Sequence, residues 1–326
     1  MKFSINKNIL QDLLLEHQKV VPIRTTLPVL SCAFLKITKQ ILTIKTTDLE
    51  QTIISTTKVK DEKDGVVCVP MNKLCEIVSA LPSEEIRINI NEDFLIEINS
   101  NQGVYKITGR DPEEFPDNPP PKTKETIEMP GKDLADIIDK TTFATSRDDL
   151  KPALSGVYIN INKDKTTAVA TDGHRLVKYE KEIKSKKNHS IVVPVKFLKI
   201  IKNTIDEKNR IKVDIDENLL STNQKNFTIT TRIIKETFPD FNSVIPDNNT
   251  IKAEIDKNQL ISCLKRVSIF SNRTTRQTVL SFSEKGVVVS AQDPETSTSG
   301  KEHADCLYKG EALTVSYNAK YLIEVL

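Results

Sequence analysis

The chain repeats itself three times, and this repeat constrains the fold more than any other feature of its 326 residues. In the first copy a short strand-like run ending at Ile5 leads into a segment that carries Leu10, Leu13 and Leu14. The same apolar places return 124 positions later, and again 250 positions after the first copy. The later sets are Met129, Leu134, Ile137 and Ile138, and then Ile255, Leu260, Cys263 and Leu264. Because spacings of three and four put side chains on one helix face, each copy predicts a strand followed by an amphipathic helix.

A second helix is predicted in each copy. It is preceded by Val69-Pro70 in the first copy, by Val193-Pro194 in the second and by Val315 in the third. The apolar residues of these segments are Leu74 and Ile77, Leu198 and Ile201, and Leu322 and Val325. Alternating apolar residues follow, with Ile86, Ile88 and Ile90 matched by Ile211, Val213 and Ile215. Strict alternation predicts strands with one buried face, so each copy combines two helices with antiparallel strands.

The first two copies also end alike, with Glu-Phe-Pro-Asp at 114–117 and Thr-Phe-Pro-Asp at 237–240. Proline-bearing linkers follow at 116–126 and 239–250. We therefore predict an α+β fold of three tandem two-helix, antiparallel-sheet domains. The predicted domains are 1–124, 125–250 and 251–326. A full third copy would run past Leu326, so we expect this copy to be incomplete at its C-terminal end.

The charges nearly balance, with 47 Lys and Arg against 45 Asp and Glu, which excludes a chain that is basic throughout. Two predicted helical segments nevertheless lack acids. Segment 195–205 carries Lys196, Lys199 and Lys202 on one face. Segment 257–273 carries Lys257, Lys265, Arg266 and Arg273. Such faces are either simply solvated or turned towards phosphates, and lysines without tryptophan suit contact with a nucleic-acid backbone rather than base stacking.

The five cysteines, at positions 32, 68, 75, 263 and 306, are scattered and form no CxxC pair. They favour a reduced, cytosolic protein in which cysteines act as small apolar residues. The sequence has no apolar stretch of membrane-spanning length, and its start does not have the pattern of a signal peptide.

One dense polar motif stands out, Thr171-Asp172-Gly173-His174-Arg175-Leu176. An enzyme would use Asp172 to orient His174 as a base, whereas a structural turn would need Gly173 for its backbone freedom. Only the aspartate recurs in the matching segments 47–50 and 292–295. The rest of the motif therefore indicates a site used once per chain, which resembles a binding pocket more than a catalytic centre.

Other catalytic patterns are missing from the sequence, including GxxxxGK(S/T), GxGxxG, HExxH and GxSxG. Asp148 and Asp149 could bind Mg²⁺, but no second group of ligands supports such a site. We predict no catalytic residue, no metal and no cofactor.

These residues resemble the bacterial β sliding clamps, the processivity subunits of DNA polymerase III. The resemblance rests on the motif at 171–176, Met-Lys-Phe at the N-terminus, Thr-Leu-Pro at 26–28, Thr-Asp-Leu-Glu at 47–50 and the two Phe-Pro-Asp triplets. It implies three similar domains per chain and a head-to-tail ring of two chains, with helices around the hole and sheets outside. It also implies a non-catalytic, cytoplasmic protein that encircles duplex DNA without regard to sequence and tethers the replicative polymerase.

The same resemblance implies functional residues. A pocket for short peptides of polymerase, clamp loader and repair proteins would comprise Leu154, Thr171, Gly173, His174, Arg175, Leu176, Pro239 and Val244. The residues facing DNA would be Arg24, Lys73, Arg147, Lys196, Lys199 and Lys202. Arg24 follows from the resemblance, and the others rest on helix position and charge. Tyr105 and Ile107 of one chain would meet Ile269 and Phe270 of the other, beside paired strand edges.

Two other hypotheses stay open. A hydrolase or nuclease would use Asp172, His174 and metal-binding acids, and replacing His174 by Ala would abolish its turnover. A clamp carrying the same change would lose peptide binding and keep its association with DNA. A repeat scaffold without a DNA partner would be indifferent to reversing the charges of Lys196, Lys199 and Lys202.

Overall fold

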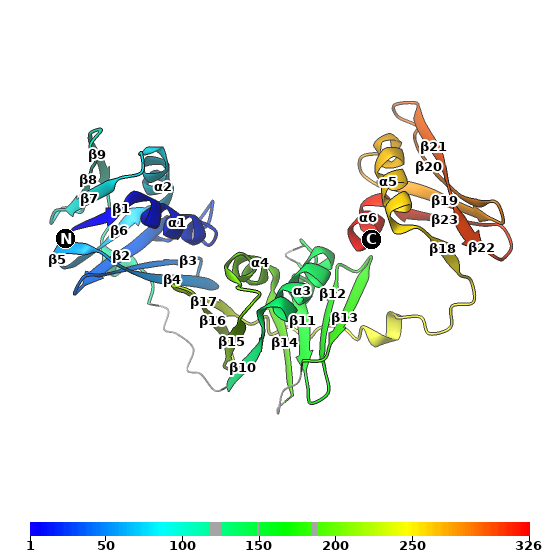
Figure 1. Cartoon of the computed structure of the whole chain (residues 1–326), viewed down its shortest axis with the longest axis horizontal. Coiled ribbons are helices and arrows are strands. Elements are labelled where there is room, and N and C mark those ends of the chain that lie inside the picture. Colours follow the sequence, from blue (N-terminus) through cyan, green and yellow to red (C-terminus); the bar gives the residue numbers. More distant parts are fainter. Residues whose placement is uncertain (118–124, 149, 184–187) are drawn as a thin grey trace. The chain divides into compact units, whose positions relative to one another are not determined.

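The computed structural model describes residues 1–117, 125–148, 150–183 and 188–326, apart from the side chains of Asp61 and Glu62. The chain forms two compact units, a larger one at Met1–Pro239 and a smaller one at Asp240–Leu326, and each is considered by itself (Figure 1). Asp149, one of the two acids weighed for Mg²⁺, lies outside the described residues. Within the described ranges, no helix is long and apolar enough to cross a membrane.

The first copy begins as predicted, with β1 (Lys2–Asn6) leading into α1 (Lys7–Gln18). Asn6 caps the helix, because its side-chain oxygen accepts a hydrogen bond from the backbone N–H of Asn8 at 2.9 Å. The other elements of this copy are the 3₁₀ helix η1 (Pro28–Ser31), β2 (Cys32–Thr38), β3 (Ile41–Thr47), β4 (Gln51–Lys58), β5 (Lys60–Lys63), β6 (Gly65–Pro70), α2 (Met71–Ala80), β7 (Glu85–Ile90), β8 (Leu95–Asn99), β9 (Val104–Thr108) and η2 (Pro112–Glu114).

The second and third copies follow the same order. The second comprises β10 (Glu125–Pro130), α3 (Gly131–Thr141), η3 (Thr142–Ala144), η4 (Pro152–Leu154), β11 (Gly156–Ile161), β12 (Thr166–Thr171), β13 (Leu176–Lys181), β14 (His189–Pro194), α4 (Val195–Thr204), β15 (Arg210–Ile215), β16 (Leu219–Gln224) and β17 (Phe227–Arg232). The smaller unit holds η5 (Asn242–Val244), β18 (Ala253–Ile255), α5 (Lys257–Val267), η6 (Ser268–Phe270), β19 (Gln277–Ser283), β20 (Gly286–Asp293), β21 (Thr298–Ala304), β22 (Cys306–Tyr308), β23 (Leu313–Asn318) and α6 (Ala319–Val325).

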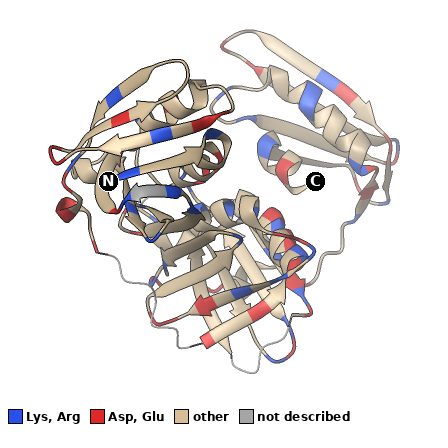
Figure 2. Cartoon of the chain, turned by 60° about the vertical axis from the view of Figure 1, so that its left-hand side comes forward, with Lys and Arg blue, Asp and Glu red and all other residues tan. Residues whose placement is uncertain are grey.

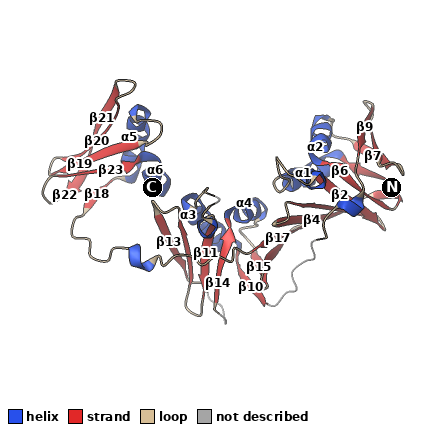
Figure 3. Cartoon of the chain, turned by 180° about the vertical axis from the view of Figure 1, so that it is seen from behind, coloured by secondary structure: helices blue, strands red, loops and turns tan. Residues whose placement is uncertain are grey.

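The described strands form antiparallel sheets with helices packed against them. In the larger unit the strand orders are β5-β1-β7-β8-β9, β10-β15-β16-β17-β4-β3-β2-β6 and β13-β12-β11-β14. In the smaller unit they are β21-β20-β19-β23 and β18-β22. The helices pack in pairs, α1 with α2, α3 with α4, and α5 with α6 (Figure 3). The predicted combination of two helices and antiparallel strands is therefore confirmed in each described copy.

The first and second copies are joined by a shared sheet. β17 of the second copy pairs with β4 of the first, with Ile229 opposite Ile53, and both side chains are almost fully buried. The backbone N–H of Arg232 also donates to the carbonyl of Glu50 at 2.9 Å, just beyond the paired strands. Strand pairing and apolar burial together make one continuous body of these two copies.

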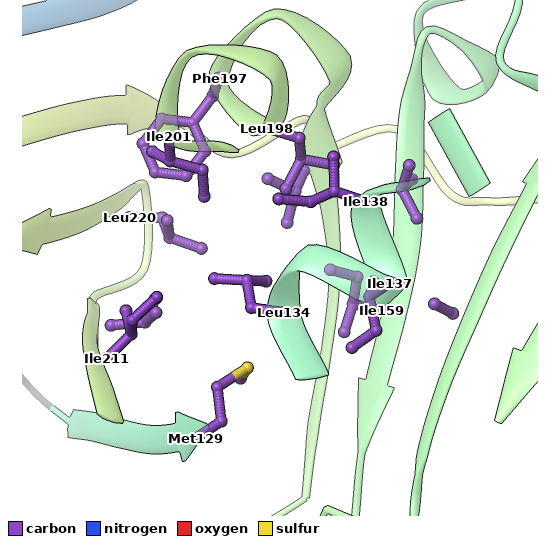
Figure 4. Packing of buried hydrophobic residues seen from close by; sticks show 14 of the residues in the cluster. Met129, Leu134, Ile137, Ile138, Ile159, Phe197, Leu198, Ile201, Ile211 and Leu220 are labelled. Carbon is purple, nitrogen blue, oxygen red and sulfur yellow. The ribbon is translucent and has the colours of Figure 1, made fainter. Parts of the chain in front are cut away.

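The predicted apolar faces form the cores. Met129, Leu134, Ile137 and Ile138 are buried together with α4 residues in the second copy (Figure 4). The first-copy set of Leu10, Leu13 and Leu14 is buried in its own cluster. In the third copy, Leu260, Cys263 and Leu264 form the matching face of α5.

One apolar assignment was wrong. Val325 was expected to face the core from the second helix of the third copy, but its side chain is 57% exposed. Leu322 and Ile323 pack against the core instead. α6 starts at Ala319, directly after β23, so its helical phase places Leu322 and Ile323 inward and turns Val325 outward.

Candidate partner pocket and DNA-facing surface

The polar motif forms a tight turn between β12 and β13. Asp172 Oδ1 accepts hydrogen bonds from the backbone N–H groups of His174 at 2.9 Å and Arg175 at 3.1 Å. Thr171 Oγ1 donates to the carbonyl of Arg175 at 2.6 Å and accepts from the N–H of Gly173 at 3.0 Å. Gly173 has a φ of +88°, and a Cβ atom added to it would meet no other atom within 4 Å. The backbone angle, and not a lack of space, therefore favours glycine here.

The recurring aspartate is a structural element of the repeat. Asp48 Oδ1 accepts from the N–H groups of Glu50 at 3.1 Å and Gln51 at 2.6 Å. Asp293 Oδ1 accepts from the N–H of Glu295 at 3.1 Å. The prediction of a turn role for Asp172 is therefore confirmed, because a carboxylate closes the same turn in each copy.

The Arg175 side chain fixes this turn against the preceding 3₁₀ helix. Its Nε donates to Asp172 Oδ2 at 3.2 Å, and its guanidinium also donates to the carbonyl of Phe143 in η3. The guanidinium lies 5.4 Å from the centre of the Phe143 ring, and the side chain is only 11% exposed. Arg175 therefore positions the turn. The neighbouring His174 is exposed to solvent.

The remaining pocket candidates come from several elements. Leu176 begins β13 and Leu154 ends η4, and both are half-buried. The carbonyl of Leu154 accepts from the N–H of Ser146 at 2.8 Å, which links the end of η4 to the residue after Thr145. Pro239 is exposed and ends the larger unit. Val244 is 66% exposed on η5 and belongs to the smaller unit.

The lysines of α4 lie on one exposed face, as predicted, but acids from other elements compensate two of them. Lys196 Nζ donates to Asp48 Oδ2 of the first copy at 2.5 Å. Lys202 pairs with Asp139 on α3. Lys199 has no ion-pair partner in the described part of the chain. Figure 2 shows acidic and basic positions interleaved on α3, so this face is less basic than α4 alone suggests.

The other predicted DNA-facing residues are exposed. Arg24 and Arg147 lie in the loops that follow α1 and η3, at equivalent places of their copies. Lys73 lies on α2 and pairs with Glu76 at 2.7 Å. Arg273 occupies the matching loop of the third copy, so the repeat itself could have identified it as a third candidate.

The predicted ring-closing residues lie on the edge strand β9 and on the 3₁₀ helix η6. Tyr105 and Ile107 are half-buried on one face of β9, an edge strand. Ile269 is 76% exposed and Phe270 37% exposed on η6. The ring of Phe270 covers Gly300 of β21, because a methyl group added to Gly300 would overlap that ring.

His17, Cys68 and Cys75 are buried groups that are held in their neutral forms. His17 is fully buried, with Nδ1 at 2.8 Å from Thr46 Oγ1 and Nε2 at 2.8 Å from Ser55 Oγ. Burial lowers the pKa of His17 to about 3. Burial raises the pKa of the Cys68 thiol to about 12 and that of Cys75 to about 11, so neither supplies a thiolate at neutral pH. Across the described ranges, His, Cys, Asp and Glu side chains gather nowhere in groups of three or more that could hold a metal.

Comparison with known proteins identifies the family. The N-terminal, central and C-terminal domain families of the DNA polymerase III beta subunit match residues 1–119, 128–240 and 242–326. The beta sliding clamp of Haemophilus influenzae is 30% identical over 335 residues, spanning all of this chain and 90% of that protein. The beta sliding clamp of Chlamydia pneumoniae is 26% identical and spans all of this chain and 89% of that protein.

Solved structures agree with the sequence comparison. The crystal structure of the DNA polymerase III subunit beta from Pseudomonas aeruginosa superposes with a TM-score of 0.90 at 27% identity, over all of this chain and 89% of that one. The sliding clamp from Bartonella birtlesii, solved bound to griselimycin, gives 0.93 at 25% identity with the same coverage. Because three domain families match in order and the fold agrees over the whole length, this chain belongs to the bacterial DNA polymerase III beta subunits, the β sliding clamps.

Proposed function

We propose that two copies of this chain form a closed ring around duplex DNA and hold DNA polymerase III on its template, without catalysing a reaction. The observation that carries the proposal is the pairing of β17 with β4. It continues the sheet of one copy into the next and buries Ile229 and Ile53 against each other. The same junction, repeated between chains, joins tandem domains into a ring.

β9 is the strand of the first copy that corresponds to β17. Tyr105 and Ile107 stand 124 positions before Ile229 and Thr231. The latter two are at most 1% exposed because β4 lies beside them, whereas Tyr105 and Ile107 stay half-exposed. Since β9 pairs with β8 alone among the described strands, its outer edge is free to receive a strand of a partner chain.

β21 is the strand of the third copy that corresponds to β4. Ile53 on β4 lies opposite Thr46, which stands two positions before the turn aspartate Asp48. Gly300 on β21 lies opposite Ala291, which stands two positions before Asp293. If β9 joins β21 as β17 joins β4, Tyr105 of one chain falls opposite Gly300 of the other. Phe270 covers Gly300, so Tyr105 and Phe270 would bury their rings together.

The turn at 172–175 supports a peptide pocket in place of a catalytic centre. Asp172 Oδ1 accepts two backbone bonds and Oδ2 accepts one from Arg175, which suits a carboxylate that holds a loop in shape. Leu154, Leu176 and Pro239 of the larger unit would provide apolar surface for a short peptide, with His174 at its rim. Such peptides would bring the polymerase, the clamp loader and repair proteins to the ring, and tethering would keep their local concentration high.

The proposed ring acts in the cytoplasm, where scattered free cysteines remain reduced. Contacts with DNA need only be weak and independent of sequence, since a closed ring cannot dissociate without opening or reaching a DNA end.

Retention on circular DNA tests this proposal. A clamp loader places the chain on nicked circular duplex, the salt concentration is raised, and retention is measured before and after the circle is cut. We expect retention on circles and loss from the cut DNA. Equal loss from both forms would refute topological linkage and leave only electrostatic binding.

A further inference from the structure

A cationic hollow of about 520 Å³ lies in the smaller unit, where the loop after η6 meets the start of α6. Arg273, Arg276 and Lys320 line it together with Ile269 and Ile323. The loop is tied to the helix, because the N–H of Ala319 donates to the carbonyl of Arg276 at 2.9 Å. Three long cationic side chains from two elements therefore surround one open space.

The hollow keeps a net positive charge. Among its lining residues Glu324 is the acid, and it lies 3.7 Å from Lys320. Within the described part of the chain, neither Arg273 nor Arg276 has an ion-pair partner. Two guanidinium groups thus remain available to a ligand, each with several N–H donors in a planar fork.

This arrangement differs from the matching face of the second copy. There Lys196 is held by Asp48 and Lys202 by Asp139, so two of three lysines already have anionic partners. An ion already paired within the protein gains less from a phosphate, because the existing pair must be broken or shared. Among the described residues, α4 therefore keeps one cation without an acidic partner, Lys199, whereas the hollow of the third copy keeps two, Arg273 and Arg276.

We propose that the hollow bounded by Arg273, Arg276 and Lys320 binds a backbone phosphate of duplex DNA, and that it contributes more to DNA affinity than the lysines of α4. The proposal rests on the proposed clamp function for the identity of its ligand. Paired guanidinium groups match the geometry of a phosphate and make no distinction between bases, which suits a protein that slides.

The same loop carries an arginine in every copy, which supports this assignment independently. Arg24, Arg147 and Arg273 each lie in the segment that joins the first helix of a copy to its first outer strand. The third copy adds Arg276 in that loop and Lys320 on the neighbouring helix. The third copy thus places two arginines of this loop and a lysine of the neighbouring helix around one hollow.

Equilibrium binding to a short linear duplex tests the site, since it requires no ring closure. The pocket variant combines R273Q, R276Q and K320Q. A matched control combines K252Q, K285Q and K309Q, which removes the same charge from three exposed lysines of the same unit. A third variant combines K196Q and K202Q. Affinity is measured by fluorescence anisotropy between about 50 and 200 mM salt.

We expect the pocket variant to bind at least about tenfold more weakly at the lowest salt. Its slope of log affinity against log salt should fall by about 0.9, which corresponds to one lost phosphate contact. The matched control and the α4 variant should change affinity by less than about threefold. Urea unfolding of every variant should match that of the original chain, which shows that the fold is intact.

Two results would overturn the proposal. If the pocket variant and the matched control weaken binding equally, the effect is one of overall charge and no site exists. If inorganic phosphate binds the hollow while the pocket variant keeps full duplex affinity, the site takes a free anion. Neither result depends on retention on circles, so a failed ring and a failed phosphate site are told apart.

Discussion

His17 gives the larger unit a predictable sensitivity to acid. The ring is 0% exposed at the end of α1, and Thr46 and Ser55 each hold one ring nitrogen at 2.8 Å. The hydroxyl of Thr46 donates its hydrogen to the backbone carbonyl of His17 at 3.3 Å, so Thr46 Oγ1 accepts a hydrogen bond from Nδ1–H of the ring. The other ring nitrogen, Nε2, then accepts from the hydroxyl of Ser55. This network satisfies a neutral imidazole, and complete burial disfavours the addition of a second proton.

Lowering the pH should therefore destabilise the fold. Burial lowers the pKa of His17 from 6.5 to about 3, so the unfolded chain binds a proton below pH 6.5 that the folded chain refuses. Stability contributed by the neutral ring is complete above pH 6.5 and is lost progressively as the pH falls towards 3. Between pH 7 and pH 5 this loss amounts to about 2 kcal/mol, because each pH unit below 6.5 costs about 1.4 kcal/mol.

Urea unfolding followed by circular dichroism at pH 7 and pH 5 measures this effect. The control is H17Q, which keeps an amide in the pocket and cannot titrate, so the remaining histidines and carboxylates contribute equally to both proteins. We expect the original chain to lose about 2 kcal/mol more than H17Q between these pH values. An equal loss in both proteins would refute the assignment of a neutral, buried His17.

Three further predictions concern single contacts. In a double-mutant cycle of K196A and D48A, the coupling energy should be favourable but no more than about 1 kcal/mol, because Lys196 is 45% exposed; additive effects in urea unfolding would contradict the pair. The G173A variant should be less stable by about 1 kcal/mol, because alanine is strained at the φ angle of +88° that Gly173 adopts. It should also bind a polymerase-derived peptide more weakly. An unchanged melting temperature would argue against backbone strain at this position. Y105A and F270A should each raise the dimer dissociation constant at least about tenfold in sedimentation experiments, with the double variant little worse than either, and fully additive losses would place the two rings apart.

The fold could be predicted from the sequence because its determinants are local. The face of each first helix is encoded within about a dozen residues, and it returns at fixed intervals with the same turn aspartate. The electrostatics could not be predicted in this way. Lys196 and Lys202 find their acids 148 and 63 residues away, on a turn of another copy and on a neighbouring helix. A helix without acids in its own sequence can therefore still be compensated once it is packed.

The two Phe-Pro-Asp segments do more than connect the copies, because their phenylalanine rings pack against residues of the sheets. Phe115 packs against Phe34 with ring centres 5.3 Å apart, and Phe238 packs against Tyr158 at 5.2 Å. Phe34 and Tyr158 stand 124 positions apart, so the same aromatic contact closes the outer face of the sheet in both copies. Val279 takes the place of Phe34 in the third copy. Val279 directly precedes Leu280, which pairs with Val289, just as Phe34 directly precedes Leu35, which pairs with Ile44.

Among the described residues, no aromatic side chain lines the hollow that Val279 borders. Val279 borders a hollow of about 890 Å³ whose lining includes the hydroxyl and amide side chains of Thr274, Gln277 and Ser290. The repeat thus preserves strand pairing while the side chain at one position of the strand changes from Phe34 and Tyr158 to Val279. Strands and helices therefore follow from the sequence pattern more readily than the sites, which depend on single side chains.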